Sequence, residues 1–453
     1  MLIRFSIENF SSFNSRQSFS MLPNMQRIKP EHKTEPIDGI SVLKTSVLFG
    51  ANASGKSNLV KAIRFGQDFL LNGMEIDKGI DYPKFRLDKK TEERDSRIEY
   101  EIQHKGKNYA YGFVFNNFQV KEEWLYRINK KKDIKIFERN SNNEKEFDLE
   151  SLTKNISIKE EKQFLEFVAK GTPRNRLFLT EIRFRRVKEN VSNIDDLLNV
   201  LDWFQNVLTV ILPEDKYNMG LRVGIRFESD IKELFETYLK YFDTGIDGVC
   251  FEKVDADSLN IPTKVLSKIK EDLISRQSGK RASFLSSNHE SFYITLNEKN
   301  ELFIEKLMTK HKIKDGGFAK FDISDESDGT NRVMDFIPLL HDLHIGNKVF
   351  IIDEMERSLH PNLVYDILDM FLNNAEERNS QLVLASHESS LLTQKLLRRD
   401  EIWFVVKSKE GESQLYSLEE YDIRFDKKVR KDYLLGRFKA VPQLGDRASL
   451  LEI

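Results

Sequence analysis

Residues 50–57 read Gly50-Ala51-Asn52-Ala53-Ser54-Gly55-Lys56-Ser57. This is the pattern G-x-x-x-x-G-K-[ST], whose successive backbone N–H groups surround a phosphate cluster. Its glycines allow backbone conformations and close approaches that a side chain would block. Lys56 is expected to meet the β- and γ-phosphates of a nucleotide, and Ser57 to offer its hydroxyl to Mg²⁺. We call residues 50–57 the phosphate loop.

The sequence on both sides of the phosphate loop agrees with this pattern. Residues 45–49 are a short apolar run typical of a buried strand, and residues 58–65 carry apolar residues at helical spacing. Strand, loop and helix are the setting that the pattern requires, because the helix N-terminus adds the positive end of its dipole to the anion site. The sequence therefore predicts an ATP site with the nucleotide-binding residues Gly50, Ala51, Asn52, Ala53, Ser54, Gly55, Lys56, Ser57 and Asn58.

A second apolar run, residues 348–354, ends in two carboxylates. Asp353 is expected to hold Mg²⁺ together with Ser57, directly or through water. Glu354 stands where a catalytic base would orient or deprotonate the attacking water. The alternative is an ordinary strand end that exposes two acids, and the presence of the phosphate loop favours the catalytic interpretation.

A third apolar run, residues 381–386, is followed by His387. Ligands of open α/β sheets bind at the carboxyl ends of the parallel strands. We therefore predict that His387 is catalytic and contacts the γ-phosphate or the attacking water. A structural histidine is the alternative.

Ser327 and Gly329 precede an apolar helical run at residues 333–340. The N-terminus of such a helix could bind a second phosphate. An ordinary helix cap is the alternative, because Ser, Asp and Gly favour these positions for local reasons. Further along the chain, Pro361 is expected to open a helix.

The composition limits the possible classes of protein. The chain has 453 residues, so two or three domains are expected. Its 71 basic and 73 acidic residues nearly balance, which argues against a protein that binds nucleic acid through an overall basic surface. A single cysteine, Cys250, fits a reducing compartment. The N-terminus alternates like a strand rather than a signal peptide, and no apolar run approaches the roughly 20 residues that span a bilayer. We expect a cytoplasmic protein without a membrane partner.

The order of patterns along the chain predicts an α/β protein. Residues 2–10 alternate like a strand, and residues 98–126 have the composition and turns of an antiparallel meander. Residues 160–210 look mainly helical, whereas residues 291–305 suggest a hairpin.

These elements, in this order, resemble the ATP-binding-cassette (ABC) class of ATPases, and within it the SMC/RecF-type heads. A more particular likeness is to the bacterial AAA-family ATPases of phage defence, such as RloA, AbiLi and the AriA subunit of PARIS. The likeness covers the two ends of the chain well and the middle poorly. It is carried by the opening pattern Ile3-x-Phe5-x-Ile7-x-Asn9-Phe10 and by residues 50–58, 123–126, 353–361, 386–387 and 433–442.

The resemblance implies an ABC-type ATPase head, with a parallel core sheet and an antiparallel β subdomain, plus a mainly helical insertion. The head would consist of residues 1–130 and 320–453, and the insertion of residues 131–319. The resemblance also implies a head-to-head dimer in which ATP lies between the phosphate loop of one subunit and a signature motif of the other. Ser327-Asp328-Gly329 would be this trans signature, although it departs from the usual Leu-Ser-Gly-Gly-Gln.

Two further features follow from the resemblance. Residues 358–360 would face across the dimer, and His387 would match the switch histidine. No glutamine in the sequence could be assigned to the usual Gln loop.

The predicted function is an ATP-hydrolysing switch, with ATP and Mg²⁺ as cofactors, that holds or releases a partner toxin or nuclease in bacterial defence. The sequence shows no second catalytic set, so a separate effector protein is expected beside the homo-oligomer. The alternative is a RecF/SMC-like ATPase that binds DNA in repair or tethering. Its support is Arg183-Phe184-Arg185-Arg186-Val187-Lys188, whose alternating spacing could put cations on one face, or could equally be a solvated edge.

Overall fold

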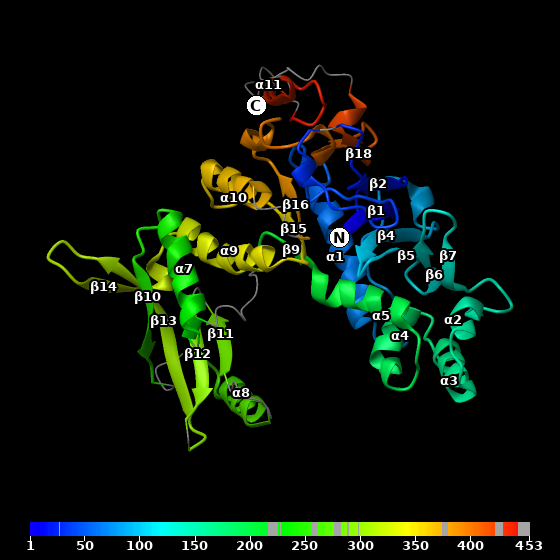
Figure 1. Ribbon diagram of the computed structural model, residues 1–453, viewed down its shortest axis with the longest axis horizontal. Coiled ribbons are helices and arrows are strands. Elements are labelled where there is room, and N and C mark those ends of the chain that lie inside the picture. The colour runs from blue at the N-terminus through cyan, green and yellow to red at the C-terminus, as the bar shows by residue number, and fades with distance from the viewer. Residues whose placement is uncertain are drawn as a thin grey trace. The chain divides into compact units, whose positions relative to one another are not determined.

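The computed structural model describes residues 1–26, 28–215, 225–226, 228–255, 261–275, 282–287, 290–297, 299–373, 379–421 and 429–442. The chain forms two compact units (Figure 1). The first unit comprises Met1–Pro213, Leu343–Arg357 and Val364–Ile453, and the second comprises Glu214–Asp342 and Ser358–Leu363. The units therefore divide the chain differently from the three predicted ranges, because residues 131–213 pack with the first unit.

A six-stranded sheet forms the nucleotide-binding half of the first unit. In spatial order its strands are β18 (Ser413–Ser417), β17 (Ile402–Lys407), β3 (Thr45–Phe49), β16 (Gln381–Ser386), β15 (Val349–Asp353) and β9 (Leu208–Ile211). All pairs are parallel except β17 with β18. Every residue of β3, β15 and β16 is buried, as expected for a parallel sheet covered on both faces. The predicted apolar strands at 45–49, 348–354 and 381–386 are confirmed.

A seven-stranded antiparallel sheet forms the other half of the first unit. Its order is β2 (Gln17–Ser20), β1 (Leu2–Glu8), β4 (Ser96–His104), β5 (Lys107–Phe115), β6 (Val120–Ile128), β7 (Ile134–Asn140) and β8 (Phe147–Asp148). The predicted meander is β4, β5 and β6. A parallel core sheet beside an antiparallel subdomain is the architecture that the resemblance implied, and the predicted α/β fold class is confirmed.

Helix α1 (Lys56–Asn72) contacts both sheets. On one side, Phe69 packs against Phe113 with ring centroids 5.6 Å apart. Gly66 is needed here, because a Cβ at this position would lie 2.2 Å from the Tyr100 hydroxyl, which donates to the Ile63 carbonyl at 2.7 Å. On the other side α1 contacts β15 and β16. The helix that follows the phosphate loop is thus fixed between two layers.

Residues 149–207 add helices to the antiparallel half: α2 (Glu150–Lys154), α3 (Lys159–Lys170), α4 (Phe178–Phe184), α5 (Asp195–Asp202) and a π-helical turn at Trp203–Val207. The buried Glu123 carboxylate accepts the backbone N–H groups of Phe178 and Leu179, at 2.5 and 3.2 Å, and so caps α4. This explains why an acid occurs at the start of the segment 123–126, which the resemblance had singled out.

For residues 183–188 the sequence left open a row of cations on one face or a solvated edge, and the structure shows that they do not form a strand. These residues lie at the end of α4 and in a 3-10 helix at Val187–Glu189. Arg183 Nη1 donates to the Leu71 carbonyl, and Arg185 Nε pairs with Glu181 at 2.8 Å. Arg185 and Arg186 form the turn between these helices, so the cations lack the regular alternation that a strand would give.

The second unit contains a five-stranded antiparallel sheet and helices. Its strands are β10 (Gly248–Lys253), β11 (Ala282–Ser287), β12 (Glu290–Leu296), β13 (Leu302–Lys312) and β14 (Phe318–Asp322), and its helices include α7 (Ser229–Tyr241) and α8 (Thr263–Ser275). Leu273 of α8 is buried with Phe292, Ile294 and Ile304 of the sheet. The predicted hairpin at 291–305 is confirmed, but residues 131–319 are mixed α and β rather than mainly helical.

The remaining helices are α9 (Asp328–Ile345), α10 (Pro361–Asn373) and α11 (Val429–Leu434). Pro361 is the first residue of α10, as predicted. Among the helices of the described ranges, none combines the length and the apolar character needed to cross a bilayer.

Candidate nucleotide site

The phosphate loop joins the end of β3 to the start of α1, and two glycines give it its shape. Gly55 has φ of +116°, and a Cβ there would lie 2.2 Å from Ser413 Oγ. A Cβ on Gly50 would lie 2.5 Å from the Val405 carbonyl oxygen. Both glycines are therefore required by conformation or contact. Asn52 and Ala53 form the exposed tip between them.

Two serines far from the loop in sequence brace it. Ser413 Oγ lies 2.5 Å from the Ser54 carbonyl oxygen and 2.7 Å from Ser12 Oγ. Asn58, on the first turn of α1, donates its side-chain amide to Ser12 Oγ at 2.8 Å. These contacts hold the loop from the side of β18 and of the turn after β1. The sequence analysis missed both serines, and no local pattern marks them.

Lys56 is almost completely buried, with 4% of its surface exposed. Its Nζ donates to the Gly50 carbonyl at 2.7 Å and to the Ala51 carbonyl at 3.3 Å. Burial lowers the pKa of Lys56 to about 8, and the nearby carboxylates of Asp353, Glu356 and Glu354 oppose this shift. The loop thus offers a desolvated cation among backbone N–H groups.

The order of the strands brings the predicted catalytic residues to this loop. β16 lies between β3 and β15, so the carboxyl ends of all three meet at one edge of the sheet. Asp353 and Glu354 stand at the end of β15, and His387 follows β16. Glu354 has φ of +49°, which is uncommon for a residue with a side chain, and its N–H donates to the Ala385 carbonyl at 2.9 Å.

Asp353 is 1% exposed, and within the described residues neither of its carboxylate oxygens has a hydrogen-bond partner of ordinary geometry. Burial raises its pKa, and the nearby Ser57 hydroxyl and Lys56 act in the opposite direction. A buried carboxylate without partners is costly unless a cation neutralises it. Mg²⁺ fits this site, because it is usually bound by one or two protein groups plus phosphate oxygens and water. Ser57 and Asp353 supply those protein groups.

Metal ligands of a different kind are not found in the part of the chain that the structure describes. No group of three or more His, Cys, Asp or Glu residues has the arrangement of a metal site there. The Ser57–Asp353 pair could thus form only part of a metal site, which the phosphates of a nucleotide would complete.

Glu356 also belongs to this edge, although the sequence analysis did not assign it. Its Oε1 accepts the backbone N–H of His387, while Oε2 has no partner among the described residues. Burial raises the pKa of Glu356, and the hydrogen bond from His387 opposes the shift. The signal was present in the sequence as a third acid close behind Asp353.

Glu356 and Lys56 both contact His387. Its backbone is held by Glu356, and its Nδ1 lies 3.4 Å from Lys56 Nζ. Burial and the charge of Lys56 lower the pKa of His387, with Glu354 opposing them. The imidazole is therefore neutral at pH 7 and can accept a hydrogen bond at Nδ1.

Ser327 and Gly329 lie in the second unit, at the start of α9. Ser327 Oγ accepts the Thr330 N–H at 3.1 Å, and Ser327 is exposed. A Cβ on Gly329 would lie 2.8 Å from the Ser358 carbonyl oxygen. The proposed trans signature and the loop at 358–360 are thus neighbours within the second unit.

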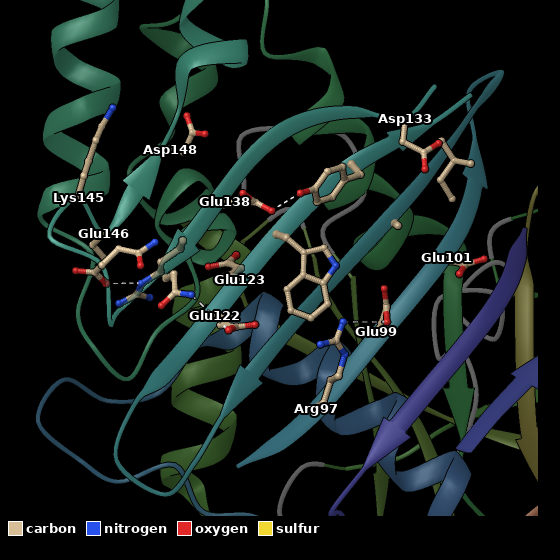
Figure 2. Close-up of a pocket in the computed structure, with 17 residues that line it drawn as sticks. Arg97, Glu99, Glu101, Glu122, Glu123, Asp133, Glu138, Lys145, Glu146 and Asp148 are labelled. Atoms are coloured by element: carbon tan, nitrogen blue, oxygen red, sulfur yellow. Dashed lines mark hydrogen bonds and ion pairs between the residues drawn. The ribbon is translucent and has the colours of Figure 1, made fainter. Parts of the chain in front are cut away.

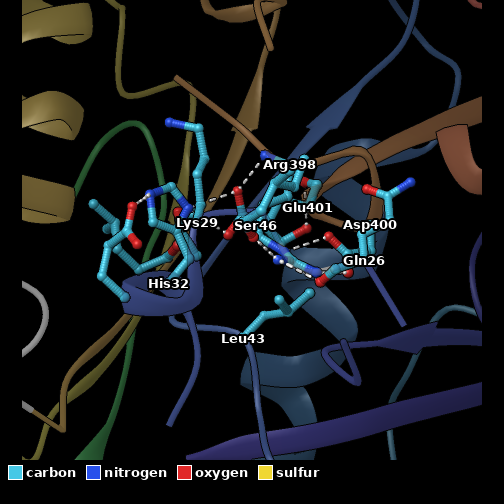
Figure 3. A network of polar contacts seen from close by, with 12 residues as sticks. Gln26, Lys29, His32, Leu43, Ser46, Arg398, Asp400 and Glu401 are labelled. Carbon is cyan, nitrogen blue, oxygen red and sulfur yellow. Dashed lines mark hydrogen bonds and ion pairs between the residues drawn. The ribbon is translucent and has the colours of Figure 1, made fainter. Parts of the chain in front are cut away.

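A buried polar network fixes β3, the strand that leads into the phosphate loop (Figure 3). The Arg398 guanidinium binds Asp400 through two contacts, of 2.9 and 2.7 Å. His32 Nδ1 lies 2.8 Å from the Glu401 carboxylate, and Ser46 of β3 donates its hydroxyl to the Glu401 carbonyl at 2.9 Å. The buried Arg398 and Asp400 charges compensate each other, and the Ser46 hydrogen bond ties β3 to this network.

A cavity of about 820 Å³ lies elsewhere, over β4 to β8 of the antiparallel sheet (Figure 2). Acidic residues outnumber basic ones in its lining, and two ion pairs lie within it: Arg97 lies 3.4 Å from Glu99, and Arg139 lies 2.6 Å from Glu146. The Arg97 guanidinium also stacks over Trp124, 4.3 Å from the ring centroid. None of the phosphate-loop residues lines this cavity. The nucleotide is therefore assigned to the phosphate loop and not to this cavity.

The fold and site define a phosphate-loop nucleotide-binding protein with an acidic strand end and a histidine beside the loop. A family model described as "AAA domain, putative AbiEii toxin, Type IV TA system" matches residues 46–393. The chain belongs to this AAA-domain family. The expected membership of the AAA-family ATPases is thus confirmed, and the particular likeness to phage-defence proteins stays a prediction.

Solved structures of SMC heads also align with the chain. The SMC head domain from Thermotoga maritima covers 92% of this chain and 98% of its own, at 10% identity and a TM-score of 0.37. An SmcHead bound to the C-winged helix domain of ScpA covers 92% and 98%, at 14% identity and a TM-score of 0.38. The Smc head domain with an extended coiled coil, bound to the C-terminal domain of ScpA, from Pyrococcus furiosus, covers 97% and 99%, at 12% identity and 0.36.

At these TM-scores the alignments carry no argument about function. A search of the curated proteins found no match.

Proposed function

We propose that this chain hydrolyses ATP with Mg²⁺ and uses the reaction as a switch in bacterial defence against phage. Two copies would close head to head on ATP, and the closed or open state would hold or release a separate toxin or nuclease. The observation that carries the proposal is the buried Asp353 carboxylate, which has no hydrogen bond of ordinary geometry from the residues that the structure describes and lies near Ser57 and the Lys56 ammonium.

The chain's own residues divide the chemistry between them. The backbone N–H groups at the start of α1 and the Lys56 ammonium would bind the phosphates. Ser57 and Asp353 would hold Mg²⁺, which offsets negative charge on the phosphate oxygens. Glu354 would accept a proton from the attacking water, and the neutral His387 imidazole would orient that water or the γ-phosphate.

The switch follows from the shape of the site. A single phosphate loop contacts a triphosphate from one side only, so a second helix N-terminus would complete the enclosure. Ser327 and Gly329 of a second copy are proposed to supply it. ATP then favours the closed dimer by its differential affinity for that state, and hydrolysis removes the bridging phosphate.

The proposed role in defence is supported by the family description, which names a toxin and a toxin–antitoxin system. A separate effector is the partner that such a switch would control. The test is affinity capture from the native host with a Glu354→Gln variant, which should trap the ATP-bound state. Recovery of the same partner with wild type plus ATP, and its loss with Lys56→Ala, is expected.

Two outcomes would contradict the proposal. One is degradation of DNA or RNA by the purified chain alone without ATP, because the chain would then be its own effector. The other is an unchanged mass in light scattering when ATP and Mg²⁺ are added to Glu354→Gln, because ATP would then not drive dimerisation.

A further inference from the structure

Positive charge gathers in α3, α4 and the turns around them. Residues 167–188 contain seven Lys or Arg residues and one acid, Glu181, a net charge of +6 in a chain whose net charge is −2. Glu181 is buried and pairs with Arg176 and Arg185, so it does not face solvent as a free anion. Glu166 and Glu189 flank the segment.

Aromatic side chains are exposed in the same place. Phe167 is 62% exposed and Phe184 is 42% exposed. Phe167 lies on the face of α3 opposite the buried residues Leu165 and Val168, so its exposure is not explained by the helix's own packing. A single exposed apolar side chain is common, but here both phenylalanines stand among cations.

Contacts join the aromatic rings to the cations. The Arg185 guanidinium lies over Phe167, 5.9 Å from the ring centroid, and also donates to the Gly171 carbonyl at 3.2 Å. Arg183 lies over Phe184 at 5.8 Å. The end of α3 and the end of α4 therefore present one surface. We define the basic–aromatic patch as the exposed residues Phe167, Lys170, Phe184, Arg185, Arg186 and Lys188.

We propose that the basic–aromatic patch binds single-stranded nucleic acid. Cations contact the phosphate backbone without regard to sequence, and exposed aromatic rings stack on unpaired bases. A duplex offers the cations the same phosphates but gives the rings no free base. The patch lies outside the phosphate loop, so the inference does not depend on the proposed ATPase switch.

The test measures fluorescence anisotropy of labelled 20-nucleotide single strands of RNA and DNA, and of a 20-base-pair duplex, with the purified full chain. The test variant carries both Arg186→Glu and Lys188→Glu, at two exposed positions. A second double variant, Arg186→Gln with Lys188→Gln, removes the positive charges without reversing them. The matched control joins Lys131→Glu to Lys132→Glu, which makes the same change of charge in the exposed turn between β6 and β7. Circular dichroism shows that each variant is folded.

The expected result is tighter binding of single strands than of the duplex. The patch reversal should weaken single-strand binding at least about 10-fold, and should reduce the salt slope by about 1.4 if both cations meet phosphates. The Lys131 and Lys132 control should stay within about twofold. Phe167→Ala and Phe184→Ala should each weaken single-strand binding about 5- to 10-fold and duplex binding less.

Three results would overturn the proposal. The first is equal affinity of the patch reversal and the control. The second is duplex binding as tight as single-strand binding, with no effect of the phenylalanine substitutions. The third is displacement of the oligonucleotide by polyglutamate at equal charge concentration, which would identify an acidic polypeptide as the ligand class.

Discussion

Helices α1 and α9 both begin with residues that sequence patterns associate with phosphate, but their first turns are satisfied differently. At α9, the Ser327 hydroxyl accepts the Thr330 N–H at 3.1 Å and so caps the helix. At α1, the residue in the same position is Gly55, and no side chain caps the helix. The first turn of α1 therefore has backbone donors available for an anion, whereas α9 already uses its own serine.

The surroundings of the two helix N-termini also favour α1 over α9 as a site for phosphate. The buried Lys56, the buried Asp353 carboxylate and His387 lie near the start of α1, and all belong to the first unit. Ser327 is exposed, and its hydroxyl lies 2.9 Å from that of Thr330 on its own helix. The comparison favours α1 as the proposed primary phosphate site, whereas the N-terminus of α9 is capped by its own Ser327.

The largest expected effect comes from Lys56→Ala. Loss of the buried ammonium should weaken ATP binding at least about 100-fold, because the charge acts in a desolvated site. Isothermal titration calorimetry with ATP and Mg²⁺ measures this. Lys61→Ala is the control, since Lys61 lies exposed on the same helix. Unchanged ATP affinity in Lys56→Ala would refute the phosphate assignment of α1.

Glu354→Gln should reduce kcat by about 10²- to 10⁴-fold and leave ATP affinity close to that of wild type. The amide keeps the size of the side chain but cannot accept the proton from water. Phosphate release under saturating ATP gives the rate. Turnover at the wild-type level would remove Glu354 from the mechanism.

Glu356 should act by positioning His387. Glu356→Leu removes the acceptor of the His387 N–H and should lower kcat about 10- to 100-fold with little change in KM. Glu356→Gln keeps an acceptor oxygen and should recover much of the loss. Equal defects in the two variants would instead point to a need for the negative charge itself.

The lowered pKa of Lys56 predicts that the protein takes up protons when it binds ATP. This pKa of about 8 means that roughly half of the ammonium is deprotonated at pH 8, whereas a bound triphosphate favours the charged form. ATP binding should therefore take up about half a proton at pH 8 and almost none at pH 6.5, and affinity should fall as pH rises above 8. Calorimetry in buffers of different ionisation enthalpy measures the uptake, and a pH-independent value near zero would contradict the shift.

The lowered pKa of Lys56 also predicts how the stability of the folded chain changes with pH. Between pH 8 and 10.5 the unfolded chain binds more protons at this lysine than the native chain does, so its contribution to stability rises with pH across that window.

The smallest effects concern Ser327. Ser327→Ala should cost about 1 kcal/mol of stability through loss of the α9 cap. Mixed with Lys56→Ala, it also tests whether α9 acts in trans: each mixed dimer then keeps one intact composite site, so ATPase activity should partly return. Two inactive variants that stay inactive when mixed would mean that α1 and α9 act within one chain, or not together.

The parts of the site that the sequence predicted are those encoded by adjacent residues. The phosphate loop needs a strand, a turn and a helix in succession, so residues 45–65 contain the whole signal. The buried strands before Asp353 and His387 were likewise visible as continuous apolar runs. The braces of the loop were not predictable, because Ser12 and Ser413 meet it only after β18 has folded beside β17.

The secondary structure of the middle of the chain was harder to predict from the sequence, for a different reason. Strands β10 and β14 of the second unit have five or six residues and several exposed positions, so their alternation is a weak signal in the sequence. The sequence also left open whether the cations at 183–188 line one face, because Glu123, which caps α4, lies on a distant strand. Long-range contacts determine the secondary structure of such segments, and these contacts cannot be read from a single sequence.

The central claim is that the start of α1 and the acidic end of β15 act on one triphosphate. A crystal structure of Glu354→Gln with ATP and Mg²⁺ tests it most directly. The account predicts the β- and γ-phosphates at the backbone N–H groups of residues 55–58, with Mg²⁺ between Ser57 and Asp353. A triphosphate bound elsewhere, or a phosphate loop left empty at saturating ATP, would contradict it.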